Sequence, residues 1–195
     1  VLRTTATKSF TITPYTTTLN WSASRFVYSG AIQVPTAKFD GVGGDGELVA
    51  NVSDLASKNV GSYSAIATTD NLNYKFSNAN YDYAIVPKEL NYTWGATSFV
   101  FNGKPQAPAV TLSGLVSGDS AVAKVGGAET NAKNGYTATI IGVDNSNYTI
   151  SGQPSVSFDI APLEKSVVWE NLSFVYDKTA KLPKVELEEP GKIIC

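Results

Sequence analysis

The chain of 195 residues has no histidine, no methionine and a single cysteine, Cys195. Without histidine the commonest general acid–base group is missing, and with one thiol no disulfide can form within the chain. The carboxylates fall mostly in expected turns or in the segment 186–189, and no spacing between them marks an acid and a base. The sequence therefore predicts a protein that is not an enzyme, with no catalytic residues, no cofactor and no metal site.

Charge and long apolar runs are also scarce. Charged residues make up 16% of the chain, the net charge is −2, and the Lys and Arg residues are scattered, so no basic surface is expected to attract nucleic acid. No apolar run is long enough to cross a bilayer, and no segment has the order of a signal peptide, so we expect no membrane contact by this segment. Hydrophobic residues nevertheless reach 43%, which excludes a disordered linker.

A pattern of proline and tryptophan recurs three times, and in each case tryptophan follows proline by seven residues: Pro14 and Trp21, Pro87 and Trp94, Pro162 and Trp169. The prolines are 73 and 75 residues apart. Five residues after each tryptophan comes an aromatic–valine–aromatic triplet, at 26–28, 99–101 and 174–176. Self-similarity at a fixed period predicts a tandem array of small domains.

The repeat also predicts the domain boundaries. Phe10 to Pro14 corresponds to Tyr83 to Pro87 and to Phe158 to Pro162. We therefore expect a piece of a longer repeat protein, which divides as follows: 1–13, the last strand of a preceding repeat; 14–86, the first repeat; 87–161, the second repeat; and 162–195, a partial third repeat.

The local pattern is that of β-structure. Apolar and polar residues alternate in Val156–Ile160, and Tyr81–Ile85 repeats the pattern, which is the period of a strand with one buried face. About six or seven short strands per repeat predict an all-β chain of tandem, small Ig-like β-sandwich repeats. The segment Leu48–Leu55 fits a helical turn or a strand, and if it is helical, β-grasp-like units are the alternative.

Two recurring polar segments have competing interpretations. D-N-x-N-Y occurs at 70–74 and 144–148; its oxygens would suit calcium, but with one carboxylate per motif a tight turn is favoured. The glycine-rich segment 41–46 is not followed by the Lys-Ser or Lys-Thr of a phosphate loop, and its counterpart 114–119 has fewer glycines, so both are predicted to be hairpin loops. A crosslink between a buried lysine and an asparagine stays open, because it depends on side chains that meet only in the fold.

The three tryptophans also have two interpretations. Each lies in an apolar-rich segment at the same point of the repeat, which favours packing in the core, where a large ring contributes most to burial. The alternative is an exposed platform for glycans. Repetition does not separate the two, because a stalk and a multivalent binder both repeat.

The second repeat carries a family resemblance, through Ile85–Leu90, Trp94, Phe99–Pro108 and Asn147–Ile150. These residues resemble the MBG-type repeats of bacterial cell-surface proteins, often described as mucin-binding-like or adhesin repeats. The resemblance covers both complete repeats and the opening of the third, and the first departs from it at Ser29–Gln33. It implies an extracellular protein, anchored to the cell wall or secreted, with such modules in series, and it identifies no ligand-binding residue.

Two functions from different classes follow. In the first, the array is a stalk that presents other domains, and its partners are the neighbouring repeats of the same chain. In the second, each repeat binds host mucin or another glycan weakly and gains affinity through multivalency. The prolines favour the stalk, because each restricts the residue before it to extended geometry.

Overall fold

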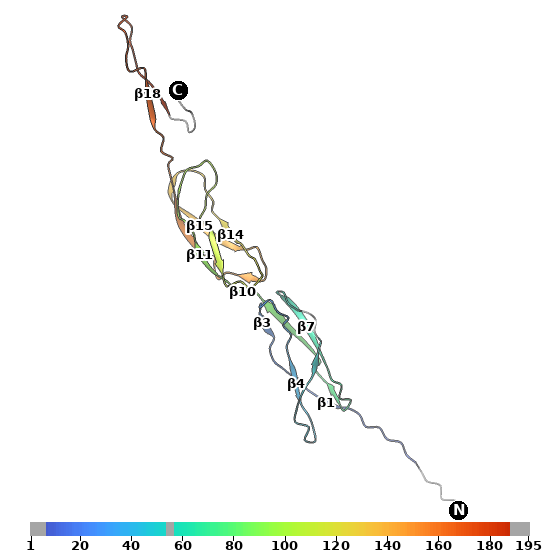
Figure 1. The fold of residues 1–195 in the computed structure, drawn as a ribbon. Coiled ribbons are helices and arrows are strands. Elements are labelled where there is room, and N and C mark those ends of the chain that lie inside the picture. Colours follow the sequence, from blue (N-terminus) through green and yellow to red (C-terminus); the bar gives the residue numbers. More distant parts are fainter. Residues whose placement is uncertain (1–6, 54–56, 188–195) are drawn as a thin grey trace, which may run out of the picture. The chain divides into compact units, whose positions relative to one another are not determined.

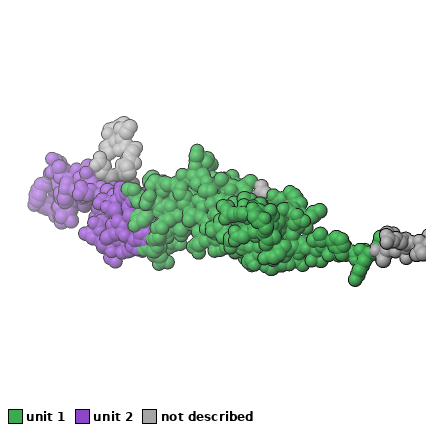
Figure 2. All heavy atoms as spheres, turned by 90° about the horizontal axis from the view of Figure 1, so that it is seen from below, with its two compact units in different colours: residues 1–93, 110–124, 141–153 green, residues 94–109, 125–140, 154–195 purple. Residues whose placement is uncertain are grey.

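The computed structural model describes residues 7–53 and 57–187, and within these ranges the chain is all-β, without a helix (Figure 1). The contacts group the chain into two compact units, coloured separately in Figure 2. The first comprises 1–93, 110–124 and 141–153, and the second comprises 94–109, 125–140 and 154–195. Each compact unit thus contains residues from more than one sequence repeat. In the described part of the chain no helix is long and apolar enough to cross a membrane.

The described residues of the first repeat form nine strands: β1 (Tyr15–Thr17), β2 (Asn20–Trp21), β3 (Arg25–Val27), β4 (Ala37–Asp40), β5 (Glu47–Val49), β6 (Asn51–Val52), β7 (Gly61–Thr68), β8 (Tyr74–Phe76) and β9 (Asn80–Val86). They form a four-stranded sheet, β3-β9-β7-β6, a three-stranded sheet, β2-β4-β5, and a parallel pair, β1-β8.

The second repeat contains eight strands: β10 (Lys88–Glu89), β11 (Asn91–Trp94), β12 (Ser98–Val100), β13 (Val110–Ser113), β14 (Ala123–Gly126), β15 (Lys133–Val143), β16 (Tyr148–Thr149) and β17 (Ser155–Ala161). Their order, β12-β17-β15-β14, β11-β13 and β10-β16, repeats that of the first repeat apart from β5. In the partial third repeat, β18 (Val167–Glu170) pairs with β19 (Lys184–Leu187).

The register of the strands recurs as well as their order. The last long strand of each repeat pairs in parallel with the strand after the tryptophan, with Phe26 opposite Ile85 in one and Phe99 opposite Ile160 in the other. Such agreement follows from the shared apolar pattern, because a slip by one residue would turn every core side chain to solvent.

Three groups of buried side chains form the hydrophobic core. Two belong to the first compact unit. One centres on Phe39 with Leu19, Ala37 and Tyr74, and the other centres on Ile85: Tyr28, Ala65, Tyr83, Leu90 and Tyr148. The second compact unit has a smaller group of Ala138, Phe158 and Ile160. The inward residues of β9 and β17 supply Tyr83, Ile85, Phe158 and Ile160, which is the alternation that the sequence predicted for these strands.

One open alternative is decided and one expectation is wrong. The part of Leu48–Leu55 that the structure describes forms strands β5 and β6 around the buried Ala50, which is the strand alternative; Asp54 and Leu55 lie outside the described residues. The segment 114–119 is not the hairpin loop that was predicted, because β13 pairs with β11 while β14 pairs with β15. The segment 41–46 does connect an antiparallel hairpin, β4–β5. A strand equivalent to β5 is absent at Ser120–Val122, so the second loop passes between sheets.

Candidate functional site

The D-N-x-N-Y segments are turns, as predicted. In the first, the Asn71 side-chain oxygen accepts the Asn73 N–H at 3.1 Å, and the Asn71 carbonyl accepts the Tyr74 N–H at 3.1 Å. Asn145 makes the same two bonds with Asn147 and Tyr148, both at 3.0 Å. Asparagine closes turns in this way through its own side chain. The side-chain oxygens of Asn71 and Asn145 thus hold the backbone of the two turns.

The tyrosine that ends each motif has a role that sequence reasoning missed. Tyr148 is buried, and its hydroxyl accepts the Val116 N–H at 2.9 Å and donates to the Asp119 carboxylate at 2.6 Å. In the first repeat the Tyr74 hydroxyl likewise accepts the Val42 N–H at 2.9 Å and donates to Asp45. The tyrosine of each turn thus holds segment 41–46 or segment 114–119 in place through two hydrogen bonds.

A sequence signal for this arrangement exists. Val42, Asp45 and Tyr74 recur as Val116, Asp119 and Tyr148, in each case 74 residues later. The signal is obscured because Gly41 and Gly114 are 73 residues apart, so that one extra residue, Leu115, precedes the valine in the second loop.

Tyr28 also contacts the pair formed by Tyr148 and Asp119. It is buried, and its hydroxyl donates to the same oxygen, Oδ2, of Asp119 at 2.7 Å. The rings of Tyr28 and Tyr148 lie edge to face, with centroids 5.4 Å apart and planes at 81°, an arrangement that aromatic pairs prefer. We name Tyr28, Asp119 and Tyr148 the tyrosine joint. It links residues of the first and second sequence repeats, all within the first compact unit.

Hydrogen bonds and burial shift the pKa values of all three side chains of the tyrosine joint. The hydrogen bond to Asp119, and then burial, raises the pKa of Tyr28 to about 12. Burial, followed by the bond to Asp119, raises the pKa of Tyr148. The hydroxyls of Tyr148 and Tyr28 in turn hold the pKa of Asp119 below its ordinary value. At neutral pH the Asp119 carboxylate therefore accepts a hydrogen bond from each of two protonated tyrosine hydroxyls. Hydrogen bonds to a charged acceptor are stronger than those between neutral groups.

Further contacts surround the tyrosine joint. The Asn147 side-chain oxygen accepts the Val60 N–H at 2.9 Å, and its amide donates to the Asn59 side chain at 3.2 Å. Gly30, at φ +76°, lies so close to Val116 that a Cβ on it would be 2.6 Å from a methyl carbon of that valine. The backbone approaches here only because glycine has no side chain.

The tryptophans do not share one environment. Trp21 is half-buried, stacks on Tyr81 with centroids 4.7 Å apart, and donates from its ring nitrogen to the Asn78 carbonyl at 3.4 Å. Trp94 is half-buried against the group around Phe158. The core prediction is wrong for Trp169, which is 57% exposed on β18. In the part of the chain that the structure describes, β18 pairs only with β19, and no second layer covers this ring.

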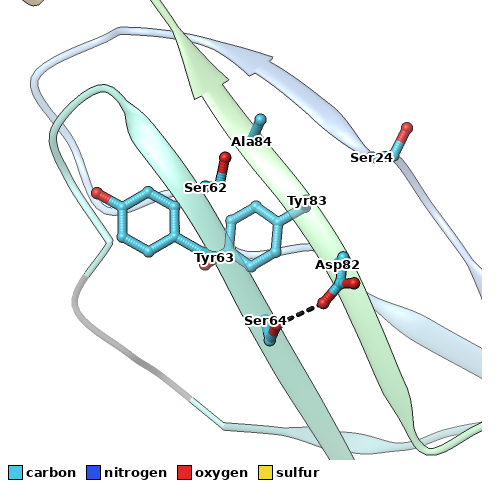
Figure 3. Close-up of a pocket in the computed structure, with 7 residues that line it drawn as sticks. All are labelled: Ser24, Ser62, Tyr63, Ser64, Asp82, Tyr83 and Ala84. Carbon is cyan, nitrogen blue, oxygen red and sulfur yellow. Dashed lines mark hydrogen bonds between the residues drawn. The ribbon is translucent and has the colours of Figure 1, made fainter.

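A surface hollow of about 580 Å³ lies over β7 and β9 (Figure 3). Its lining is rich in hydroxyls: Ser24, Ser62, Tyr63, Ser64, Asp82, Tyr83 and Ala84. The Ser64 hydroxyl donates to the Asp82 carboxylate across the two strands. The rings of Tyr63 and Tyr83 stack on the opposite, core-facing side of the two strands, with centroids 5.5 Å apart. Hydroxyls and one carboxylate are groups that suit a neutral polar ligand.

A crosslink between lysine and asparagine would need a buried lysine. None of the lysines within 7–53 and 57–187 is buried, and the most covered, Lys88, is half-buried. The arrangement for such a crosslink is therefore not found in this part of the chain.

No family model, no curated protein and no solved structure matches the chain. The likeness to MBG-type repeats stays a prediction from the residues quoted above.

Proposed function

We propose that the chain is a non-catalytic tandem repeat segment of a bacterial surface adhesin, and that it acts as an extended stalk that presents other domains. On this proposal each repeat is a small Ig-like β-sandwich, and the protein is extracellular, either anchored to the cell wall or secreted. The neighbouring repeats are the partners of each module.

The observation that carries this proposal is the tyrosine joint. A stalk needs modules that are tied to their neighbours, and Tyr28 of one sequence repeat donates to Asp119 of the next at 2.7 Å. Both groups are polar and would cost free energy if they were buried without each other. Their bond therefore favours the joined arrangement over free modules on a linker.

The path of the chain gives a second line of support. Strand β9 ends at Val86, Pro87 follows, and β10 begins at Lys88. No loop separates the last strand of one repeat from the first of the next, and Pro87 keeps Val86 extended. A short, stiff connection of this kind suits a stalk better than a flexible tether does.

Small-angle X-ray scattering of the full chain tests the stalk. We expect an elongated particle, and a smaller maximum dimension for the variant Pro87→Gly, because glycine restores freedom at the connection. Pro105→Gly, at an exposed position within the second repeat, is the control and should leave the maximum dimension unchanged. A compact particle for the unmodified chain would contradict the proposal.

The hollow over β7 and β9 favours a second candidate, a multivalent module that binds mucin or another glycan. The Ser62 and Ser64 hydroxyls and the Asp82 carboxylate line it, and sugars are bound by such hydroxyl and carboxylate contacts. This candidate differs from the tryptophan platform, because Trp21 is engaged with Tyr81 and lies outside the hollow.

A glycan array separates the two candidates. Reproducible binding that is lost in Asp82→Ala and retained in Thr139→Ala, a strand hydroxyl outside the hollow that bonds Ser155 at 2.9 Å, would establish the binding module. Binding that survives Asp82→Ala would place the glycan elsewhere. An array without hits would contradict the binding module.

A further inference from the structure

Two Asn-Gly pairs occur in the sequence, Asn102–Gly103 and Asn134–Gly135, and both asparagines are exposed. An asparagine loses its side-chain amide most readily in this dipeptide, because glycine leaves the backbone nitrogen after the asparagine unobstructed and flexible. The reaction requires that nitrogen to lose its proton and to reach the side-chain carbonyl carbon, Cγ. The structure gives the two nitrogens different surroundings.

The first pair is free to react. It lies in the loop after β12, Gly103 has φ +75°, and a Cβ on it would meet nothing within 4 Å. Among the described residues no acceptor bonds the Gly103 N–H. The Asn102 side-chain oxygen accepts the Lys104 N–H at 2.9 Å. A backbone donor therefore already faces the oxygen on which negative charge develops when the Gly103 nitrogen attacks Cγ.

The second pair is restrained. It forms a bulge in β15, where Asn134 and Gly135 lie opposite Asp159 of β17. The Gly135 N–H donates to the Asp159 carboxylate at 2.7 Å. This bond must break before the nitrogen can attack, and the negative charge of the carboxylate opposes the loss of a proton from the nitrogen beside it. The Tyr136 hydroxyl donates to the Asn131 carbonyl at 3.2 Å and closes the surrounding turn.

We propose that Asn102 deamidates spontaneously in the folded chain. Asn134 is protected by the bond between Gly135 and Asp159. At Asn102 the Gly103 nitrogen gives its proton to hydroxide from the solvent and forms a bond to Cγ, and the side-chain amide takes up a proton and leaves as ammonia. Water then opens the resulting succinimide ring at either carbonyl, which gives aspartate or isoaspartate. The net reaction consumes one water and releases one ammonia.

Of the two complete repeats, only the second carries an asparagine at this point of the loop. The counterpart of Asn102 in the first repeat is Ser29, which is followed by Gly30, and the Ser29 hydroxyl accepts the Ala31 N–H at 3.4 Å. The first loop thus has a similar turn, but a hydroxyl has no amide to lose. Deamidation therefore adds a negative charge to the loop of the second repeat alone, and isoaspartate also lengthens its backbone by one carbon.

Peptide mapping by mass spectrometry follows both asparagines while the full chain is aged in mildly alkaline buffer. Trypsin, which does not cut before proline, places them in separate peptides, 89–124 and 134–165. In the folded chain we expect Asn102 to deamidate faster than Asn134 by about tenfold or more, as expected for the loss of a hydrogen bond to a charged group. In guanidinium chloride the two rates should become similar, because each pair then lies in an open chain.

The variant Asp159→Ala tests the protection. It removes the acceptor of the Gly135 N–H and should raise the rate at Asn134 by about tenfold or more, with no change at Asn102. Asp82→Ala, which removes an exposed carboxylate from the first repeat, is the control and should change neither rate. Circular dichroism checks that both variants keep their β-structure.

The variant Gly103→Ala tests the reactive pair. Its methyl group hinders the attacking nitrogen, so deamidation at Asn102 should slow while the rate at Asn134 stays the same. Equal rates at the two asparagines in the folded chain would overturn the proposal, and so would a rate at Asn134 that Asp159→Ala leaves unchanged.

Discussion

Tyr28 and Asp119 lie 91 residues apart in the chain, and the hydroxyl of the first donates to the carboxylate of the second at 2.7 Å. Their contact explains why the compact units do not follow the sequence repeats. Residues 110–124 and 141–153 of the second repeat supply Asp119 and Tyr148, and both ranges group with 1–93. The buried group around Ile85 continues through Tyr28 to Leu90 and Tyr148. The core of one repeat is thus shared with part of the next.

Loss of the Tyr28 hydroxyl should weaken the tyrosine joint. In Tyr28→Phe the ring still packs on Tyr148, but Asp119 loses one of its two donors. We expect a fall in Tm of about 2–6 °C, measured by differential scanning calorimetry. Phe101→Tyr is the reciprocal control, because Phe101 is the counterpart of Tyr28 in the second repeat and packs in the Phe158 group without a hydroxyl. An unchanged Tm for Tyr28→Phe would show that the bond adds nothing to stability.

Stability should depend on pH at both extremes. The pKa of Tyr28 is about 12 in the folded chain and about 10 when unfolded, so the folded state holds this proton more tightly. Its contribution is complete below about pH 10 and is lost as the pH rises toward about 12. The pKa of Asp119 is lowered, so its contribution is present above about pH 4 and is lost as the pH falls through the lowered value.

The comparison of the unmodified chain with Tyr28→Phe isolates this effect. The difference in Tm between the two should be constant between about pH 5 and pH 9 and should shrink on either side. A difference that grows above about pH 10 would contradict the sign of the Tyr28 shift.

Gly30 and Gly103 form a matched pair for testing the close approach at the joint. Both have positive φ, 76° and 75°, so an alanine at either costs about 1–2 kcal/mol in backbone strain. At Gly30 the new Cβ would also meet Val116 at 2.6 Å, while at Gly103 nothing lies within 4 Å. We expect Gly30→Ala to lower the free energy of unfolding by about 1–3 kcal/mol more than Gly103→Ala does.

Chemical denaturation measures both variants, and a double variant gives the control. Val116→Ala shortens the side chain that the new Cβ meets, so Gly30→Ala combined with Val116→Ala should cost less than the sum of the two single changes. If the two variants lost the same free energy of unfolding, the contact between the new Cβ at position 30 and Val116 would be relieved by a movement that costs no stability.

The tryptophans should differ in their contribution to stability. Trp21→Ala removes a half-buried ring that stacks on Tyr81, and we expect a loss of about 2–4 kcal/mol in the free energy of unfolding. Trp169→Ala removes a ring that is 57% exposed and should cost about 0.5 kcal/mol or less. Urea denaturation followed by circular dichroism measures both. Similar losses would indicate that Trp169 is covered in solution.

Much of the fold follows from local pattern. The alternation in Tyr81–Ile85 and Val156–Ile160 predicted strands that the structure confirms as parts of β9 and β17, and the Asn and Asp residues of D-N-x-N-Y predicted the turns. These features depend on neighbours in sequence, and the repetition supplied a second copy of each. The all-β class therefore came from the residues alone.

The tyrosine joint could not be predicted in the same way. Tyr28 is one tyrosine in a strand-like triplet, and its partner lies in another repeat, so no local pattern links it to Asp119. The failure at Trp169 has a related cause. Burial of an aromatic ring depends on whether a second layer of structure packs on its face of the strand. The residues around Trp169 do not determine whether that layer is present.

The parallel pairing of β3 with β9, and of β1 with β8, has a mechanical consequence. When a repeat is pulled from its two ends, the force acts along strands that run side by side in the same direction, so their hydrogen bonds are loaded in shear and several must break at once. An antiparallel hairpin pulled at its open end would instead unzip one bond at a time. The strand order thus gives the two complete repeats resistance to tension, in a chain whose single cysteine can form no internal disulfide to bear the load.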